Sequence, residues 1–284
     1  GVLNIVTASR QRAAEVVDVW LDDPRVRKIS FTGSTPVGKH LARRSADTLK
    51  KLSLELGGNA PFIVFDDADL DAAVDGLMAG KFRNGGQTCV SPNRVFVQAG
   101  VHDRFVDKLG ARIKALKVGP ASDEGSQIGP MINAKAVDKI ERHVRDAVER
   151  GARVVVGGQR LAALGRNFFA PTLLVDADAP MACSCEETFG PVVPVTRFET
   201  EAEVLAAANG TPFGLAAYFY SRDVKRIWRL ADALEAGLVG INEGALAAEA
   251  APFGGVKESG YGREGSVHGL DDYLHLKYLC QGQL

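Results

Sequence analysis

Short apolar runs alternate with helix-like stretches from the beginning of the chain. Strand-like runs occupy residues 1–6, 26–33 and 51–58, and helix-like stretches lie between them at residues 9–23 and 34–50. Strands that alternate with helices favour crossover units and a parallel sheet, because parallel neighbours need a long return connection. The pattern therefore predicts that residues 1–57 form part of a doubly wound α/β domain.

The rest of the chain carries a second α/β series, which begins with a buried-looking apolar strand at residues 59–66. Asp67 and Asp69 then indicate the start of a helix. The Gly-rich stretch 253–265 is expected to be a loop, and residues 272–280 alternate with the period of a strand. The other expected strands are 93–98, 153–158, 168–176, 191–198, 216–221 and 237–242, and the other expected helices are 101–116, 133–152 and 223–234. No linker separates the two series, so we expect them to pack closely.

Composition excludes two classes of partner. The 284 residues carry a formal charge of −1, so there is no basic surplus for nucleic acid or for an anionic membrane surface. The longest apolar runs fall far short of the roughly 20 residues that span a bilayer, so no transmembrane helix is expected. We therefore expect neither nucleic acid nor a membrane as a partner.

Four irregularly spaced cysteines do not form a disulfide framework. This usage fits a reducing compartment, so we predict a cytoplasmic location. The first residue is Gly1, and the chain opens directly in an apolar run without a charged leader. We therefore expect the chain to be a piece of a longer protein.

The sequence GSTPVG, residues 33–38, lies between an expected strand and an expected helix. Backbone N–H groups at such a helix start favour an anion, so a dinucleotide pyrophosphate fits beside Ser34, and Pro36 fits the first helical turn. Many strand-to-helix turns of Gly, Ser and Thr bind nothing, so both interpretations stay open. Gly33 to Lys39 also match seven positions of the P-loop, but the eighth is His40 instead of Ser or Thr, which argues against a nucleoside triphosphatase.

Cys89, in FRNGGQTCVSPNR, is the candidate nucleophile. A lone cysteine is usually a small buried hydrophobe. Here the preceding glycines, Gly85 and Gly86, allow unusual backbone angles, and the polar neighbours make a poor core. None of the five histidines (His40, His102, His143, His268 and His275) lies in a recognisable partner motif for a cysteine hydrolase.

Three other groups of polar residues have contrasting interpretations. Glu55 ends an apolar strand before Gly57 and Gly58, where burial would raise its pKa toward the value of a general base. Adjacent Glu186 and Glu187, taken alone, are typical of a solvated charge pair. Cys183 and Cys185 have no second ligand pair nearby, so we expect no metal site.

Five segments together resemble the aldehyde dehydrogenase superfamily, in the same order and along essentially the whole chain. They are FTGSTPVG, LELGG, GGQTC, EETFGP and PFGGVKESGYGREG. Within the superfamily the chain is most similar to succinate semialdehyde dehydrogenases, judged from NAPFIVFDDADLD, KFRNGGQTCV, GLAAYFYSRD and LKYLC. The resemblance implies an α/β fold with a partial Rossmann-type cofactor domain followed by an α/β catalytic domain. It also implies domain ranges of 1–57 (cofactor), 58–257 (catalytic) and 258–284 (a return segment and oligomerisation strand).

The resemblance assigns roles to individual residues. It implies that Cys89 is the nucleophile, that Glu55 is the base, and that Glu187 holds the nicotinamide ribose of NADP or NAD. Arg83 corresponds to the arginine that pairs with the distal carboxylate of the substrate, and Phe253 lies on the substrate side. The remaining implied cofactor contacts are Phe31, Thr32, Gly33, Ser34, Val37, Leu56, Gly57 and Phe189.

Three departures from the family pattern qualify these roles. Ser91 replaces a second cysteine, which rules out a disulfide switch in that loop. Ala247 and Ala248 stand where semialdehyde enzymes often carry serines that bind the substrate carboxylate, which leaves Arg83 as the main determinant. The oxyanion Asn, the ribose-binding Lys and the first half of the cofactor sheet lie upstream in the family and are missing here.

The resemblance implies oxidation of a small aldehyde, such as succinate semialdehyde, to its acid through a thiohemiacetal and a thioester on Cys89. A catalytically inert fragment of such an enzyme is the alternative. Residues 272–280 resemble the tail strand that family members add to a partner subunit, so a homo-oligomer is expected; an internal edge strand is the alternative.

Overall fold

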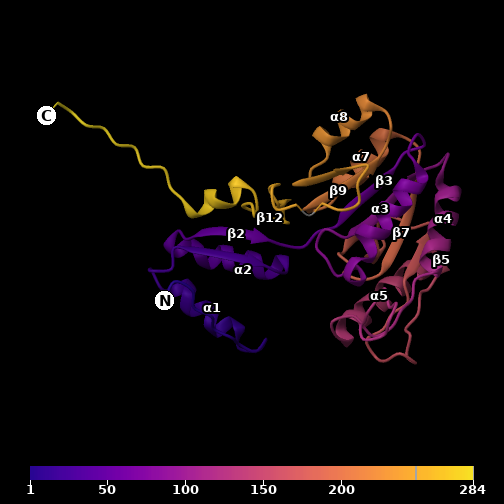
Figure 1. Cartoon of the computed structure of the whole chain (residues 1–284), viewed down its shortest axis with the longest axis horizontal. Coiled ribbons are helices and arrows are strands. Elements are labelled where there is room, and N and C mark those ends of the chain that lie inside the picture. Colours follow the sequence, from indigo (N-terminus) through magenta and orange to yellow (C-terminus); the bar gives the residue numbers. More distant parts are fainter. Residues whose placement is uncertain (247, 284) are drawn as a thin grey trace.

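The computed structural model describes residues 1–246 and 248–283. Ala247, one of the two alanines that stand where semialdehyde enzymes often carry serines, lies outside the described residues. Two sheets organise the described chain, a larger one that forms the main body and a smaller one beside it (Figure 1).

The larger sheet has the strand order β10-β9-β3-β4-β7-β6-β5. All neighbouring strands are parallel except the pair β5 and β6, which is antiparallel. The bounds are β3 Ala60–Val64, β4 Pro92–Gln98, β5 Arg153–Val156, β6 Thr172–Val175, β7 Val192–Phe198, β9 Ala216–Tyr220 and β10 Leu238–Ile241. The expected parallel α/β arrangement is thus confirmed for this part of the chain.

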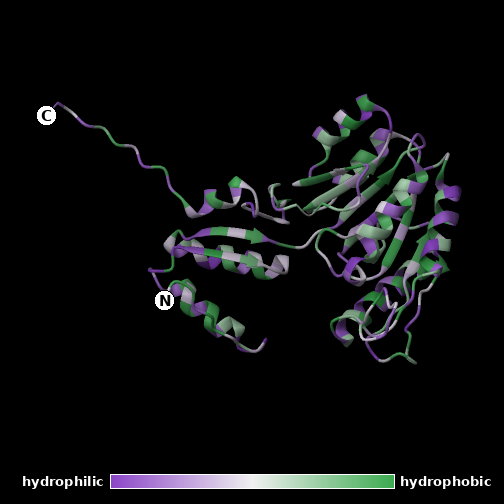
Figure 2. Cartoon of the chain, in the orientation of Figure 1, coloured by the Kyte–Doolittle hydropathy of each residue, from purple (hydrophilic) through white to green (hydrophobic). Residues whose placement is uncertain are grey.

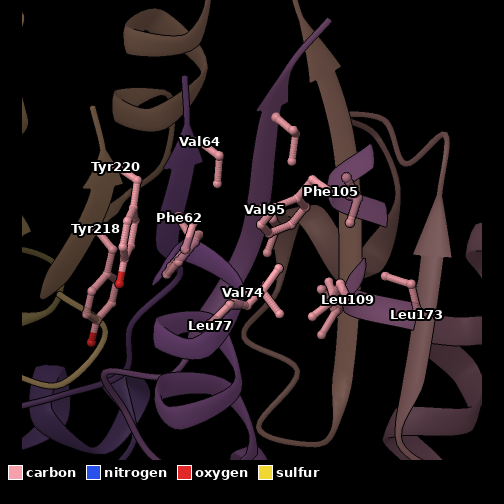
Figure 3. Packing of buried hydrophobic residues seen from close by; sticks show 14 of the residues in the cluster. Phe62, Val64, Val74, Leu77, Val95, Phe105, Leu109, Leu173, Tyr218 and Tyr220 are labelled. Carbon is pink, nitrogen blue, oxygen red and sulfur yellow. The ribbon is translucent and has the colours of Figure 1, made fainter. Parts of the chain in front are cut away.

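The continuous apolar character of the central strands follows from helices on both faces of the sheet. On β3, Phe62 and Val64 pack into the core on one face, and Ile63 packs into the core on the other. The ring of Phe62 lies beside those of Tyr218 and Tyr220 of β9, with ring centroids 6.0 and 5.1 Å away (Figure 3). Successive side chains point to opposite faces, so both faces need cover.

Helices α3 (Leu70–Phe82) and α4 (His102–Lys114) cover one face, while α5 (Ala134–Glu149), α7 (Glu201–Asn209) and α8 (Val224–Ala233) cover the other. Short α6 is Ala182–Cys185. The helices turn apolar residues to the sheet and polar residues outward, as Figure 2 shows by colour. Asp69 caps α3 by accepting from the N–H groups of Asp71 and Ala72, as its position before the helix predicts.

The smaller sheet has the order β1-β2-β12, with β1 Lys28–Thr32, β2 Lys51–Glu55 and β12 Gly260–Tyr261. Strands β1 and β2 are parallel, and β12 returns antiparallel to β2. Helices α1 (Ala13–Asp22) and α2 (Thr35–Ser45) belong to the same region, and a 3-10 turn, Ala46–Thr48, follows α2. Strands β8 (Phe213–Gly214) and β11 (Val256–Lys257) form a separate two-stranded antiparallel ribbon.

Three expectations about elements were wrong, and one helix was not predicted. Residues 1–6 form no strand: Val2 is fully exposed and has no strand partner in the described chain. Residues 272–280 form no strand within the described chain, so the alternative of an internal edge strand is wrong, while strand addition to a partner subunit stays a prediction. A 3-10 helix spans Val267–Tyr273, and the remainder runs outward without a partner among the described residues (Figure 1). A strand needs a neighbour for its backbone groups, and periodicity alone does not supply one.

The stretch 253–265, expected as a loop, contains β11 and β12. Gly260 has φ +112°, and a Cβ there would lie 1.8 Å from the carbonyl oxygen of Leu54, so its glycine permits close strand approach. Helix α7 was not predicted, although Thr200 and Glu203 form a capping box that signals its start. Among the described residues, the structure has no helix long and apolar enough to cross a membrane.

Candidate active site

A cavity of about 700 Å³ opens where the two sheets meet. It is bounded by the carboxyl ends of β1 and β2, the loop after α3, the start of α5, and the segment before β7. Eleven of the thirteen residues singled out from the sequence line it: Thr32, Gly33, Ser34, Glu55, Leu56, Gly57, Arg83, Cys89, Glu187, Phe189 and Phe253. Phe31 and Val37 do not.

Strand register brings the first group together. Thr32 and Glu55 are paired neighbours at the ends of β1 and β2, and the N–H of Gly33 donates to the carbonyl oxygen of Glu55 at 2.9 Å. Helix α2 begins immediately afterwards, with Ser34 as an N-cap whose side chain makes no capping hydrogen bond. The first N–H groups of α2 therefore remain available to an anion at this edge of the cavity.

Phe31 and Val37 contribute indirectly or lie apart. The ring of Phe31 packs on the small core of Leu21, Ile29 and Leu41, and a Cβ at Gly33 would lie 2.4 Å from that ring. The Phe31 ring thus packs against the turn at residue 33 and leaves no room for a side chain there, which explains why this residue is glycine. Val37 is 44% exposed and does not line the cavity.

The carboxyl group of Glu55 is buried without compensation. Glu55 is 3% exposed, and neither carboxylate oxygen has a hydrogen-bond partner among the described residues. Burial, assisted by the negative charge of Glu264 and opposed by Arg263, raises the pKa of Glu55 to about 7. A carboxyl group with this pKa exchanges a proton near neutral pH, as a general base must.

The loop that carries Cys89 begins with left-handed backbone. Asn84 (φ 51°), Gly85 (φ 64°) and Gly86 (φ 78°) turn the chain after α3, and a Cβ on Gly86 would lie 2.3 Å from the carbonyl oxygen of Gly190. This turn presents Cys89, which is half-buried, to the cavity. The left-handed turn begins at Asn84, one residue before the two glycines.

The Cys89 thiol lies in an electronegative setting. Burial and the negative charges of Glu187 and Glu55 raise its pKa, while its own N–H and that of Val90 lower it. The two N–H groups favour negative charge at this point, whether on sulfur or on an oxygen bonded to a carbon that sulfur attacks. A bound cation or a neutralised carboxylate would favour the thiolate further.

Glu187 and Glu186 lie in different environments, so the solvated pair suggested by the residues alone is wrong for Glu187. Glu186 pairs with Arg142 at 2.7 Å on the surface. Glu187 is half-buried, and its Oε1 accepts the N–H of Gly58 at 3.1 Å. Burial raises the pKa of Glu187, and the Gly58 N–H with Lys139 and Lys81 opposes this rise.

Sequence reasoning missed several residues near the cavity. Lys139 of α5 lines it and donates to the carbonyl oxygen of Glu187. Lys81 is fully buried with no hydrogen-bond partner for Nζ in the described chain, and burial lowers its pKa to about 7. Lys81 lies on α3 and Lys139 on α5, and only the packing of these two helices directs the lysines toward Glu187. The other missed lining residues are Gln87, Thr88, Val90, Ala136 and Thr188.

The lysine of the P-loop pattern is turned away from the cavity. Lys39 forms an ion pair with Glu258 at 2.7 Å and does not line the cavity. A P-loop lysine reaches the β- and γ-phosphates of its nucleotide. The position of Lys39 therefore gives no support to the triphosphatase interpretation.

Gly58 is a sensitive point of the site. A Cβ there would lie 2.4 Å from the carbonyl oxygen of Cys89. We predict that Gly58→Ala lowers the free energy of unfolding by about 1–3 kcal/mol, because the loop that carries Cys89 must shift. Urea titration of the variant measures this. Gly100→Ala is the control, since its nearest neighbour would be 3.9 Å away; equal stability of the two variants would contradict the close contact.

The site and fold together define a member of one enzyme family. The model of the aldehyde dehydrogenase family matches residues 1–279, and the chain belongs to this family. It is 57% identical to an NADP(+) succinate-semialdehyde dehydrogenase of Escherichia coli, covering 99% of this chain and 58% of the relative. It is 56% identical to a glutarate-semialdehyde dehydrogenase of Pseudomonas aeruginosa, with the same coverage.

Solved structures agree with this assignment. An NADP-dependent enzyme of E. coli superposes with a TM-score of 0.96 at 56% identity, covering 99% of this chain and 57% of that chain. The α/β aldehyde dehydrogenase fold expected from the sequence is thereby confirmed. The chain spans less than three fifths of the length of these relatives.

Proposed function

We propose that this chain carries the catalytic half of an NAD(P)-dependent aldehyde dehydrogenase that oxidises a small semialdehyde. One observation carries the proposal: a single cavity gathers a thiol (Cys89), a carboxyl group whose pKa is near 7 (Glu55) and a helix start suited to phosphate (Ser34). The named activities of the relatives support it. Succinate semialdehyde is the favoured substrate, and glutarate semialdehyde is the nearest competitor.

The cavity fits a dinucleotide. Gly33 and Ser34 would hold the pyrophosphate at the start of α2, and Glu187 would accept hydrogen bonds from a ribose. A Cβ on Gly57 would lie 3.3 Å from Oε2 of Glu187, so the glycine keeps a flat surface open beside Leu56 and Phe189. When bound, the nicotinamide supplies the hydride acceptor. NADP is the favoured form, since the E. coli relative is named for it.

Cys89 performs the first covalent step. Its thiolate adds to the aldehyde carbon and forms a thiohemiacetal, and the negative charge moves to the former carbonyl oxygen. The N–H groups of Cys89 and Val90 face this region and stabilise that charge. Loss of hydride from the same carbon leaves a thioester on the sulfur.

Glu55 then releases the product. Its carboxylate takes a proton from a water, the hydroxide attacks the thioester carbon, and the C–S bond breaks to give the acid and the free thiolate. Burial has raised the pKa of Glu55 to about 7, so its ionised form is a stronger base than an exposed glutamate.

Arg83 is the proposed anchor of the distal carboxylate. It lines the cavity and is exposed, so its guanidinium is accessible to a ligand. Ala248, in place of a serine, offers no hydroxyl. We predict that Arg83→Ala raises KM for succinate semialdehyde by about 10- to 100-fold, the effect of losing a charged hydrogen bond, with little change in kcat. A neutral aldehyde of the same length is the control; an equal rise for both substrates would contradict the role.

The alternative is a folded but catalytically inert fragment. The chain covers 58% of the E. coli relative. We propose that the part it does not cover lies upstream and includes the second oxyanion donor, whose loss costs about 10²- to 10³-fold in rate. Strand β1 has no neighbour on its outer side in the described chain, and Leu3 and Trp20 are 80% and 42% exposed. These surfaces suit cover by further strands.

The domain ranges 1–57, 58–257 and 258–284 remain our proposal, as do the cytoplasmic location and the homo-oligomer. In support of the last, Leu276 and Tyr278 are 105% and 87% exposed in the outward-running tail. Alternating apolar residues without a partner suit addition to the sheet of a second subunit.

A paired assay tests the proposal. The chain alone is compared with the completed chain, meaning this chain preceded by the upstream segment of its E. coli relative. Both receive succinate semialdehyde, glutarate semialdehyde or a neutral aldehyde with NADP or NAD, and formation of the reduced cofactor is followed. If only the completed chain turns over, the result supports the proposed activity and also shows that the 284-residue chain by itself is an inert fragment. If neither protein turns over, the proposed activity is refuted.

A further inference from the structure

The segment that carries Glu187 is held by side chains instead of by a strand partner. Two buried asparagines, Asn59 before β3 and Asn93 in β4, are each 3% exposed. Asn93 Nδ2 donates to Asn59 Oδ1 at 2.7 Å, to the carbonyl oxygen of Glu186 at 3.0 Å and to that of Cys183 at 3.2 Å. Asn59 Nδ2 donates to the carbonyl oxygen of Ser184 at 2.9 Å. The two amides thus fix the backbone ahead of Glu187.

The backbone after Glu187 is fixed by the same residue. The N–H of Thr188 donates to Asn93 Oδ1 at 3.1 Å. Asn93 therefore bonds the peptide groups on both sides of Glu187, with a donor on one and an acceptor on the other. An amide side chain alone offers both functions at this spacing.

Helix α5 holds the outer side chains of the segment. His143 is fully buried, with Nδ1 at 3.1 Å from Thr188 Oγ1 and Nε2 at 3.2 Å from Glu186 Oε2. Burial lowers the pKa of His143, which favours its neutral form. Glu186 and Thr188 are thus turned toward α5, and Glu187 between them faces the cavity.

The position of the Glu187 carboxylate is narrowly limited. Its Oε1 accepts from the Gly58 N–H at 3.1 Å, and Gly58 in turn lies against the carbonyl oxygen of Cys89, as the 2.4 Å approach of a Cβ there shows. Asn59 follows Gly58 directly in the chain. The hydrogen bond between Asn59 and Asn93 therefore links the residue next to the Gly58 donor with the residue that holds the Glu187 segment. A shift of the segment moves the carboxylate relative to both Gly58 and Cys89.

We propose that Asn93, through its bonds to Asn59 and to the peptides on either side of Glu187, is a positioning residue for cofactor binding. This inference rests on the proposed function, in which Glu187 binds the ribose. Asn93 itself lines no part of the cavity and touches neither substrate nor cofactor. Its proposed effect on the cofactor is transmitted through the position of Glu187.

A double-mutant cycle tests the inference in the completed chain. Binding is measured as the Kd for NADPH from its fluorescence, so the result does not depend on any aldehyde being oxidised. We expect Asn93→Ala to raise this Kd about tenfold, as expected when a charged hydrogen bond is misaligned. In a Glu187→Gln background, the same substitution should change the Kd less than about twofold, because the two residues act in series.

Controls separate positioning from general stability. Asn209 also bonds two backbone groups, Ala233 and Glu235, but outside the cavity; Asn209→Ala should leave the Kd unchanged. If Asn93→Ala does not fold, the Kd for NADPH is measured for Asn93→Asp instead. Aspartate keeps the shape of the side chain and the acceptor for the Thr188 N–H, but it lacks the N–H donors to the carbonyl oxygen of Glu186.

Three outcomes would overturn the inference: an unchanged Kd in a folded Asn93 variant, a full tenfold effect that persists with Gln at position 187, or an equal effect of Asn209→Ala. If the unsubstituted completed chain binds NADPH but oxidises no aldehyde, the proposed function is wrong. The test of Asn93 as a positioning residue still holds in that case, because it measures only cofactor binding.

Discussion

Replacing Cys89 by alanine should abolish aldehyde-dependent reduction of the cofactor by the completed chain. The sulfur forms the only covalent bond to the substrate in the proposed reaction, and removal of a catalytic nucleophile costs up to about 10⁶-fold in kcat. Binding of NADPH should remain, because the glycine turn and α2 are unaltered. Stopped-flow absorbance measures the first quantity, and NADPH fluorescence the second.

A second cysteine provides the matched control. Cys280 is exposed and lies outside the cavity, so Cys280→Ser should retain full turnover. Iodoacetamide should inactivate the unsubstituted protein and the Cys280 variant alike. Turnover that persists in Cys89→Ala, or that disappears in Cys280→Ser, would remove Cys89 from the role of nucleophile.

Glu55→Gln should slow hydrolysis of the thioester by about 10²- to 10⁴-fold while the first burst of reduced cofactor remains. Glutamine keeps the shape of the side chain but cannot take a proton from water. In the unsubstituted protein, the steady-state rate should fall below about pH 7, where the Glu55 carboxyl group is protonated. A pH profile and a burst experiment measure the two effects; loss of the burst itself would assign Glu55 to an earlier step.

The same substitution should stabilise the fold. The pKa of Glu55 is about 7 in the folded chain against 4.5 for a free glutamate, so between these values the folded state retains a proton that the unfolded state has lost. Stability therefore falls as pH rises through this window and is level above it. Glu55→Gln removes this cost, raising the free energy of unfolding by up to about 3 kcal/mol at pH 8 and by little at pH 4.5.

Urea titrations at pH 4.5 and pH 8 measure this difference. Glu124, which is exposed and forms no ion pair in the described chain, serves as the control, since Glu124→Gln should change stability equally little at both pH values. A Glu55→Gln variant less stable than the parent at pH 8 would mean that its carboxylate is better solvated than the geometry shows. The expected gain in stability with loss of rate is typical of a group that is buried for function.

Local patterns in the sequence predicted most elements of the larger sheet. The apolar run at residues 59–66 is β3, with Asp69 capping the helix that follows, because burial on both faces and capping are both local properties. Residues 1–6 and 272–280 have equally good strand patterns, but the described chain offers them no neighbour. Strand formation depends on a partner, which periodicity does not identify.

The site divides in the same way. Motifs in the sequence pointed to Cys89 and Glu55, because glycines beside a thiol and a carboxylate at a strand end leave a local signature. By itself the sequence thus predicted the family and the α/β class, which are confirmed, and it pointed to the candidate reactive groups, whose roles remain a proposal. Only the tertiary structure decided that Glu187 is half-buried while Glu186 is exposed, and that Asn93 from a distant strand bonds the peptides on both sides of Glu187. Burial and long-range hydrogen bonds depend on which elements pack together. Two adjacent glutamates look the same in the sequence, so the sequence cannot show which of them is more buried.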